Sequence, residues 1–392
     1  MYLPPEECRP KDCTDDVSDS FIGLQVPANP DVIVVGGGAV GAACARELAV
    51  AGRRVLLVER GVPDGEAWRA AAGMLAPQIE TEPEAPLFDL GIAGRERYVI
   101  LASELLEGTG IDIGLWGSGI ANVATDERTA GVLRTRVALQ RQHGHLCDWL
   151  DAAEVRARWP QLGPSCGALW APREATLDPS DLVRALLLDA QRRGATLVHD
   201  EIVSIESANG KVTGVRGRER YAAPDVVIAA GAWSGHLDGL PRPLSVEPVR
   251  GQMAAVPWPA GLPPGVFYHH NSYMLFRQGE AILGSTMEYV GFRPQVTEAG
   301  LASIVAKVSA LYPALASTGL QRSWAGLRPM SPDGLPIIGA EPSLPGLWYA
   351  TGHGRNGILM AGITGVLVRQ LLDRTATREE LSLLRPDRFW TW

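Results

Sequence analysis

The chain has 392 residues, of which 46% are hydrophobic, enough to bury a large core and to form two domains. Its formal net charge of −8 gives no reason to expect binding to nucleic acid or to an anionic membrane surface. No apolar run approaches the length of a bilayer span, so no membrane association is predicted.

Residues 1–30 are polar and acidic and contain no apolar segment of the kind found in a secretory signal. We therefore predict that they form a mobile leader ending near Pro30. The five cysteines form neither a C-x-x-C pair nor a recognisable zinc pattern, so we predict no metal and a reducing, cytoplasmic location. Cys8 and Cys13 lie in the leader, where metal binding or mutual pairing stays open, but we favour no special role for them.

Residues 31–60 have the pattern of a dinucleotide-binding unit. A buried strand over 31–35 runs into the sequence GGGAVG, which is followed by a helix over 42–51 and a second buried strand over 54–58. These parts occur in the order that such a unit requires. The alternative is an ordinary βαβ unit with a glycine-rich turn, which this order disfavours.

Four residues of this unit have predicted roles in holding a dinucleotide. Gly36 permits the tight turn, Gly38 lets the backbone approach a pyrophosphate, and Gly41 lets the helix lie close to the strand. Glu59, at the end of the second strand, can accept the hydroxyls of an adenosine ribose. The motif alone does not decide between FAD and NAD.

The chain then leaves the nucleotide-binding pattern. In residues 70–77, alanines and a glycine let the backbone pass close to a flat or bulky group, so we predict a cofactor contact there rather than a short helix. The next elements carry no nucleotide signature: helices over 87–107, 128–143 and 151–158, a pair of short strands within 111–123, and a strand over 146–150.

An α/β pattern returns near residue 178. Asp178 is the predicted N-cap of a helix over 182–193, and Asn209-Gly210 predicts a hairpin between strands over 202–207 and 211–215. The other predicted elements are strands over 195–199 and 225–233, an irregular proline-rich segment over 241–265, antiparallel strands over 267–276 and 281–287, a helix over 300–311, a strand within 324–339 and a long helix within 348–372.

The alternation predicts an α/β protein, α+β overall, with a discontinuous Rossmann-like cofactor domain and a second domain built on a mixed or antiparallel sheet. The cofactor domain is assigned residues 31–108, 176–240 and 325–392, and the substrate domain residues 109–175 and 241–324. An NAD dehydrogenase would more often keep its cofactor domain in one piece.

Residues 352–358 are glycine or asparagine at four of seven positions and directly precede a predicted helix. Backbone N–H groups there, with the helix dipole behind them, would suit the edge of a flavin that gains negative charge on reduction. The alternative is a glycine-rich helix entry with no further role.

From about Asp31 onward, nearly the whole chain resembles the FAD-dependent amine and amino-acid oxidases of the D-amino-acid oxidase superfamily, and within it the bacterial glycine oxidases of thiamine biosynthesis. The stretches that carry the resemblance include VVGGGAVG…LLVER, AAAGMLAPQIE, AGLRPMSPDGLPIIG and GHGRNGILMAGITG. The resemblance implies an FAD-binding domain of the glutathione-reductase type and makes a homo-oligomer plausible.

The resemblance also implies substrate-site roles for four residues. Arg328 would hold the substrate carboxylate in a bidentate pair, and Tyr273 would help to hold it. Arg355 would lie near both ligand and flavin, and Met287 would line the pocket. The alternatives are a surface ion pair for an arginine and core packing for the tyrosine and the methionine.

The cofactor contacts follow from the motif and the resemblance together. They are Gly36, Gly38, Ala39, Val40, Gly41, Glu59, Arg60, Ala72, Gly73, Met74, Val203, Gly231, His353, Gly354, Arg355, Asn356, Gly357, Ile358 and Leu359. Residues 67–69 read AWR where the family has small hydroxylated residues, which puts the flavin contacts there in question. No cysteine or histidine is placed for a covalent flavin link, so we predict non-covalent FAD.

The implied reaction is the oxidation of glycine, or of another small amino acid such as sarcosine or D-alanine, by hydride transfer to the flavin. O2 would be reduced to H2O2, and glycine would give glyoxylate and ammonia. This oxidation of glycine could supply thiazole synthesis in thiamine biosynthesis. The route needs orientation rather than a dedicated base, and His269 and His270 are assigned to the pocket rim. The alternatives are a sarcosine, D-proline or D-amino-acid oxidase or dehydrogenase, and a non-catalytic flavin-binding protein.

Overall fold

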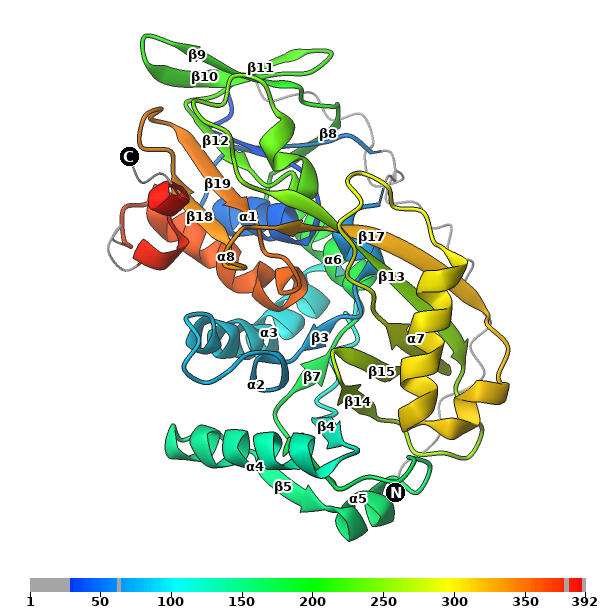
Figure 1. The fold of residues 1–392 in the computed structure, drawn as a ribbon. Coiled ribbons are helices and arrows are strands. Elements are labelled where there is room, and N and C mark those ends of the chain that lie inside the picture. Colours follow the sequence, from blue (N-terminus) through cyan, green and yellow to red (C-terminus); the bar gives the residue numbers. More distant parts are fainter. Residues whose placement is uncertain (1–28, 62–64, 377–380, 390–392) are drawn as a thin grey trace.

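The computed structural model describes residues 29–61, 65–376 and 381–389. The predicted leader, apart from its last two residues, therefore lies outside the described part of the chain, as do Cys8 and Cys13. Figure 1 shows the strands of one sheet around α1 and α8 and those of a second sheet below and to the right of them. No helix among the described residues is long and apolar enough to cross a bilayer.

The first sheet has six strands in the order β18-β19-β12-β1-β2-β8. All neighbouring pairs are parallel except β18 and β19. The strands are β1 (Val32–Val35), β2 (Val55–Glu59), β8 (Thr196–His199), β12 (Asp225–Ile228), β18 (Ile337–Ala340) and β19 (Leu347–Thr351). Its central strands are buried on both faces, which explains their continuous apolar runs.

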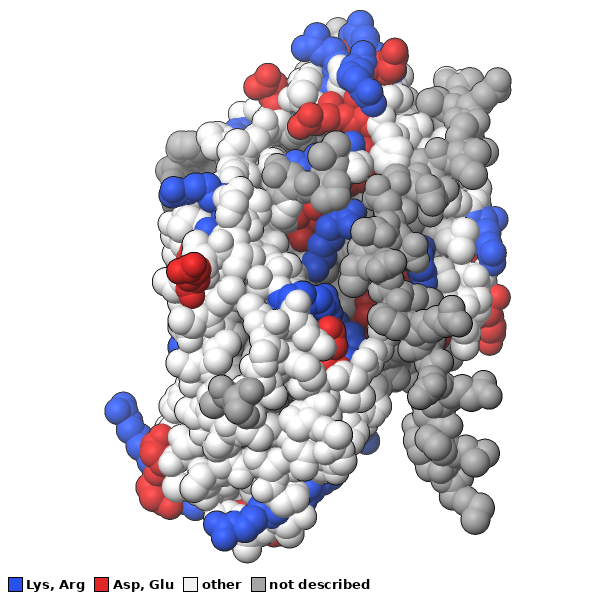
Figure 2. All heavy atoms as spheres, turned by 90° about the vertical axis from the view of Figure 1, so that its right-hand side faces the viewer, with Lys and Arg blue, Asp and Glu red and all other residues white. Residues whose placement is uncertain are grey.

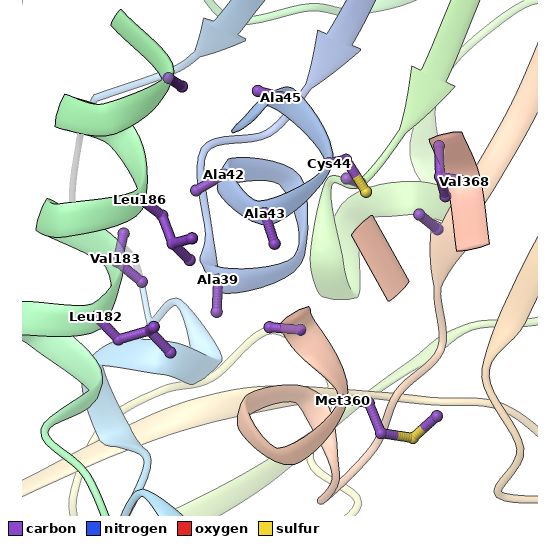
Figure 3. Close-up of a cluster of buried hydrophobic side chains, with 14 of the residues drawn as sticks. Ala39, Ala42, Ala43, Cys44, Ala45, Leu182, Val183, Leu186, Met360 and Val368 are labelled. Atoms are coloured by element: carbon purple, nitrogen blue, oxygen red, sulfur yellow. The ribbon is translucent and has the colours of Figure 1, made fainter. Parts of the chain in front are cut away.

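Four helices share one face of this sheet: α1 (Ala39–Val50), α3 (Phe88–Thr109), α6 (Pro179–Arg192) and α8 (Gly357–Leu372). Figure 3 shows α1 between α6 and α8, with the small side chains of α1 directed at both neighbours. Such side chains allow close packing: a Cβ added at Gly365 of α8 would lie 2.6 Å from the Ala43 carbonyl oxygen of α1. The predicted N-cap of α6 is confirmed, because Asp178 accepts hydrogen bonds from the N–H groups of Ser180 and Asp181.

The opposite face carries a three-stranded sheet of β9 (Ser204–Ala208), β10 (Lys211–Arg216) and β11 (Arg220–Ala222). The predicted hairpin is confirmed: β9 and β10 are antiparallel, and Asn209 and Gly210 between them both have positive φ, 52° and 72°. A two-residue turn of this hand matches the twist of the flanking strands.

The second large sheet has eight strands in the order β17-β13-β16-β15-β14-β4-β6-β5. Its strands are β4 (Ile120–Ala124), β5 (Asp148–Asp151), β6 (Gly167–Ala171), β13 (Glu247–Pro257), β14 (Val266–His269), β15 (Ser272–Arg277), β16 (Glu280–Gly284) and β17 (Arg322–Met330). Only β14 and β4 are parallel neighbours, so the sheet is mixed, and the predicted fold class is confirmed.

Helices cover both faces of the second sheet. One apolar cluster joins α4 (Glu127–Gln142) to one face, and another joins α5 (Ala152–Arg158) and α7 (Glu298–Leu311) to the other. The short elements are α2 (Pro77–Glu80), the strand pair β3 (Met74–Leu75) and β7 (Ala175–Thr176), and the 3-10 helices η2 (Ala67–Ala70), η3 (Gly231–His236), η4 (Pro313–Ser317), η5 (Ser382–Leu384) and η6 (Pro386–Phe389). On the face drawn in Figure 2, charged side chains gather at both ends and near the middle, and much of the remaining surface is uncharged.

The prediction of an irregular segment over 241–265 is wrong. β13 occupies Glu247–Pro257, is buried along most of its length, and pairs with β16 on one side and β17 on the other. Pro248 and Pro257 conceal the strand in the sequence, because proline normally disfavours a central strand. Pro248 is the second residue of β13 and Pro257 is the last, positions where a missing N–H interrupts the ladder least.

Two further strand predictions need correction. Residues 267–276 form two strands, β14 and β15, because His270 and Asn271 adopt positive φ values of 43° and 59° and turn the chain back. Histidine and asparagine are enriched among the non-glycine residues that adopt positive φ, so this pair is a turn signal that the strand prediction did not use. In 111–123 the structure has β4 but no strand pair; Trp116 makes only an isolated bridge to Thr176.

Candidate functional site

A cavity is lined by residues from both large sheets. The six-stranded sheet contributes residues at the carboxyl ends of its strands, including Gly36 after β1 and Glu59 at the end of β2. The eight-stranded sheet contributes Tyr273 of β15, Ser285 just after β16 and Arg328 of β17. The carboxyl ends of parallel strands are where open α/β sheets bind ligands.

The glycine turn after β1 leaves the start of α1 open to this cavity. Gly36 has φ +103°, and a Cβ added there would lie 2.5 Å from the Ala229 carbonyl oxygen. Gly38 is the N-cap of α1 and provides no side-chain hydrogen bond, so the first N–H groups of the helix, at Ala39 and Val40, face the lined space without a capping side chain. This is an anion-binding arrangement.

Gly41 has a packing role. A Cβ added there would lie 1.9 Å from the Gly36 carbonyl oxygen, and Gly41 is not among the lining residues. Its place therefore fits the prediction that it lets the helix lie close to the strand.

The Glu59 carboxylate lies beside the turn. It accepts hydrogen bonds from the backbone N–H groups of Gly37 at 2.6 Å and Gly61 at 3.2 Å. Next to it, the Arg60 guanidinium carbon lies 3.9 Å from the Trp233 ring centroid, and Arg60 also pairs with Glu66 at 3.0 Å. A carboxylate held beside the glycine turn that leads into a helix N-terminus is suited to a ribose attached to a pyrophosphate.

The opposite part of the cavity is lined by His353, Gly354, Arg355, Gly357 and Ile358. α8 starts at Gly357, and its N-cap makes no side-chain hydrogen bond. His353 is buried, its Nε2 lies 2.9 Å from Thr364 Oγ1, and burial lowers its pKa to about 3. The ring is therefore neutral at pH 7, so a positive field here comes from the helix terminus and Arg355.

Arg328 reaches the cavity from β17. Its Nη1 donates to the Thr286 carbonyl oxygen at 3.0 Å, and its Nη2 donates to Ser285 Oγ at 2.8 Å. No carboxylate in the described part of the chain forms an ion pair with it. Burial lowers the pKa of Arg328, which marks a cation whose desolvation these neutral groups do not offset.

Tyr273 lies close to Arg328. Burial raises the pKa of its phenol, an effect that the charges of Arg328 and Arg355 oppose. Its hydroxyl is 3.0 Å from Met253 Sδ, a weak acceptor. The phenol is therefore neutral and could donate more strongly to an anion held at Arg328.

Arg355, in contrast, has a partner. Its Nη2 donates to Glu80 Oε1 at 2.8 Å, and the charge of Glu80 is the main cause of the raised pKa of Arg355. Glu80 lies at the end of the four-residue helix α2 and lines the same cavity. Of these two arginines, Arg355 has a carboxylate partner and Arg328 has none among the described residues.

Most of the predicted site residues line this cavity together: Gly36, Gly38, Ala39, Val40, Glu59, Arg60, Ala72, Gly73, Met74, Gly231, Tyr273, Arg328, His353, Gly354, Arg355, Gly357 and Ile358. Five others do not line it: Gly41, Val203, Met287, Asn356 and Leu359. Val203 and Met287 are 48% and 44% exposed. Their predicted contacts stay predictions.

The two histidines assigned to the rim are not lining residues either. His269 is buried, with Nδ1 2.9 Å from the Val123 carbonyl oxygen. His270 Nε2 lies 3.9 Å from an Asp126 carboxylate oxygen. Neither contact involves a group of the cavity.

Sequence analysis missed several lining residues, including Glu80, Trp68, Trp233, Gly251 and Ser285. Glu80 ends the stretch AAAGMLAPQIE, so a signal for it was present in the sequence. Trp68 belongs to the AWR triplet that departs from the family pattern, and its ring lies against Gly38, 3.3 Å from the position of an added Cβ.

The groups that line the cavity match the groups of an FAD molecule. The uncapped start of α1 suits the pyrophosphate, the Glu59 carboxylate suits the ribose, and the glycine-rich start of α8 offers backbone N–H groups to a ring edge that gains negative charge. Among the described residues, no group of three His, Cys, Asp or Glu side chains is placed to hold a metal ion.

Comparison with known proteins gives consistent matches over most of the chain. Residues 31–371 match the family described as FAD dependent oxidoreductase, DAO. The glycine oxidase of Geobacillus kaustophilus is 36% identical over 359 residues, covering 90% of this chain and 95% of that protein. The bifunctional protein ThiO/ThiG of Trichormus variabilis is 34% identical over 371 residues, covering 92% of this chain and 55% of that protein.

A solved structure agrees with these matches. The crystal structure of the glycine oxidase from Geobacillus kaustophilus superposes with a TM-score of 0.87 at 35% identity, covering 92% of this chain and 99% of that chain.

Proposed function

Because the chain belongs to the family of FAD-dependent oxidoreductases, and within it to the group of the glycine oxidases, we propose that it oxidises glycine to glyoxylate and ammonia with reduction of O2 to H2O2. Other small amino acids, such as sarcosine or D-alanine, are secondary substrates in this proposal.

The observation that carries the proposal is the state of Arg328. Its guanidinium faces the cavity and is held by a carbonyl oxygen and a hydroxyl, without a carboxylate partner among the described residues. A substrate carboxylate would supply the missing charge in a planar, bidentate pair. The neutral Tyr273 phenol lies where it can add a hydrogen bond to the same carboxylate.

Arg328, Tyr273 and Met74 together orient the amino acid in this proposal. The carboxylate is fixed at Arg328, and the apolar surface of Met74 and Tyr273 limits the space for a side chain. FAD supplies the chemistry when bound, since it accepts two electrons and a proton from the substrate and passes electrons to O2. Such a route depends on orientation rather than on a dedicated base, and His353, whose pKa burial lowers to about 3, is a weak base.

The other predictions made from the sequence, on domains, flavin linkage, assembly and location, belong to this proposal as well. The sheet membership of the strands supports the division into a cofactor domain and a substrate domain, although the boundary at residue 325 falls within β17. Non-covalent FAD, a homo-oligomer and a cytoplasmic location are part of the same proposal. The similarity to a bifunctional ThiO/ThiG protein supports a supply of oxidised glycine to thiazole synthesis in thiamine biosynthesis.

A substrate panel tests the proposal. We expect purified, FAD-loaded protein to release H2O2 with glycine, and more slowly with sarcosine, D-alanine or D-proline. Flavin reduction by glycine without H2O2 release would indicate a dehydrogenase. No reduction by any amino acid of the panel would indicate a non-catalytic flavin-binding protein.

A further inference from the structure

The cavity presents more guanidinium groups than a single carboxylate needs. Arg328 and Arg355 both line it, and their charges repel: the charge of Arg355 contributes to the lowered pKa of Arg328, after burial. Two guanidinium groups in one cavity would ordinarily favour a ligand with two anionic groups. The contacts of the two arginines show why this cavity does not favour a ligand with two anionic groups.

Glu80 compensates only one of the two arginines. Its Oε1 lies 2.8 Å from Arg355 Nη2, and the side chains of Glu80 and Arg355 are 15% and 24% exposed. Arg328 instead donates to Thr286 and Ser285, which are neutral at those atoms. The pair of Glu80 and Arg355 adds no net charge, so Arg328 is the one net cation among these three groups.

We propose that Glu80 determines substrate specificity: by occupying Arg355, it restricts the site to amino acids that carry one anionic group. The proposal rests on the proposed function, because it concerns which amino acids that site admits. A second carboxylate entering next to Arg355 would meet a guanidinium already engaged and a like charge on Glu80. Repulsion of this kind is a common way to reject a wrong ligand.

The proposal makes a specific prediction for Glu80→Gln. Glutamine keeps the size of the side chain and an acceptor oxygen for Arg355, but it removes the negative charge. Arg355 then becomes a second anion site in the cavity. The variant should gain affinity for dianionic ligands while its affinity for monoanionic ligands changes little.

The chain offers a matched control in Glu82→Gln. Glu82 lies two residues from Glu80, has a side chain that is 66% exposed, and pairs with Arg136 at 3.3 Å. It does not line the cavity. This variant removes the same charge at nearly the same place in the chain, but outside the site.

The test uses acetate and malonate, two unreactive ligands that differ by one carboxylate, with FAD-loaded protein. Binding is followed by the change each ligand causes in the absorbance of the bound flavin. We expect the ratio of malonate to acetate affinity to rise at least tenfold in Glu80→Gln and to stay unchanged in Glu82→Gln. In Glu80→Gln with Arg355→Gln the gain should disappear, because the freed cation is absent.

Substrates give a second readout. N-carboxymethylglycine (iminodiacetate) and sarcosine differ in the same way, and the ratio of their kcat/KM values should shift toward the diacid in Glu80→Gln. A uniform structural loss would lower both values together and leave the ratio unchanged.

Several results would overturn the proposal. One is an unchanged malonate-to-acetate ratio in Glu80→Gln that still binds FAD and acetate. If Glu80→Gln does not fold, the wild-type protein still provides a test, because malonate binding tighter than acetate would contradict a site closed to dianions. Absence of amino-acid oxidation by the wild-type protein would instead overturn the proposed function, and the ligand-binding ratios would remain interpretable.

Discussion

At Arg328, a guanidinium is held by a backbone carbonyl and a serine hydroxyl rather than by a carboxylate. A lysine at this position would keep the charge but could not donate in the same plane to Thr286, Ser285 and a substrate carboxylate. For Arg328→Lys we expect the KM for glycine to rise by roughly 10-fold to 100-fold, because the charge stays but a planar, charged hydrogen bond worth about 1.5–3 kcal/mol is lost. FAD content should not change.

The control for this prediction is Arg322→Lys on the same strand. Arg322 is exposed and pairs with Glu280 at 2.6 Å, outside the cavity. Steady-state kinetics at saturating O2 measure both variants. A KM for glycine that is the same in Arg328→Lys and Arg322→Lys would remove Arg328 from its assigned role.

His353 gives a pH-dependent prediction. Burial lowers its pKa from the ordinary 6.5 to about 3. Between these values the unfolded chain binds a proton here that the native protein does not, so native stability falls as the pH falls, by at most ~1.4 kcal/mol per pH unit from this group. We expect His353→Asn to lose less Tm between pH 7 and pH 5 than the wild-type protein.

Thermal unfolding at several pH values measures this effect, with His143→Asn as the control, since His143 is exposed at the end of α4. Equal pH dependence in wild type and His353→Asn would show that His353 does not contribute.

The resemblance to the amino-acid oxidases predicted the places of Arg328 and Arg355 in the candidate site, because each stands in a stretch that carries the resemblance. Glu80 was not assigned, although its stretch was noted. Its importance comes from a contact with Arg355, 275 residues away in the chain. A carboxylate at the end of a four-residue helix has no periodicity or spacing that points to such a contact.

Helices α1 and α8 approach each other as closely as their small residues permit. A Cβ at Gly365 would lie 2.6 Å from the Ala43 carbonyl oxygen, so the two backbones would have to separate. We expect Gly365→Ala to destabilise the protein by about 1–3 kcal/mol, as overpacking of a tight core does.

A glycine elsewhere in the chain provides the opposite control. Gly131 lies in α4, and nothing lies within 4 Å of a Cβ added there. Gly131→Ala should stabilise the protein by up to ~1 kcal/mol through helix propensity. Denaturant unfolding measures both changes, and a Gly365→Ala variant as stable as Gly131→Ala would contradict the close approach of α1 and α8.

Sequence patterns predicted the elements that depend on residues close together in the chain. The cap at Asp178 and the turn at Asn209-Gly210 depend on side chains within a few residues, and both are confirmed. β13 was missed because its evidence is non-local: two partner strands bury it, and prolines near its ends mask it. The turn at His270 and Asn271 was missed because the apolar residues on both sides of it predict one continuous strand, although both residue types favour positive φ.

For the whole molecule, the cavity joins the two large sheets, so a cofactor bound in it contacts residues of both. A ligand that binds only the native state stabilises it, by about 2.7 kcal/mol at one hundred times its Kd. We expect removal of FAD to lower the Tm and re-addition to restore it. Because the link is predicted to be non-covalent, acid precipitation should leave the yellow colour in the supernatant; a yellow pellet would contradict this.

In the proposed function, Arg328 holds the carboxylate of an amino acid for oxidation by FAD. Anaerobic mixing of the FAD-loaded protein with glycine, and separately with glycine methyl ester, tests it most directly through the loss of the oxidised flavin's yellow absorbance. We predict rapid bleaching by glycine in the wild-type protein, slow bleaching by the ester, and little difference between the two in Arg328→Ala. Equal bleaching by glycine and its ester in the wild-type protein, or no bleaching by glycine, would contradict the claim.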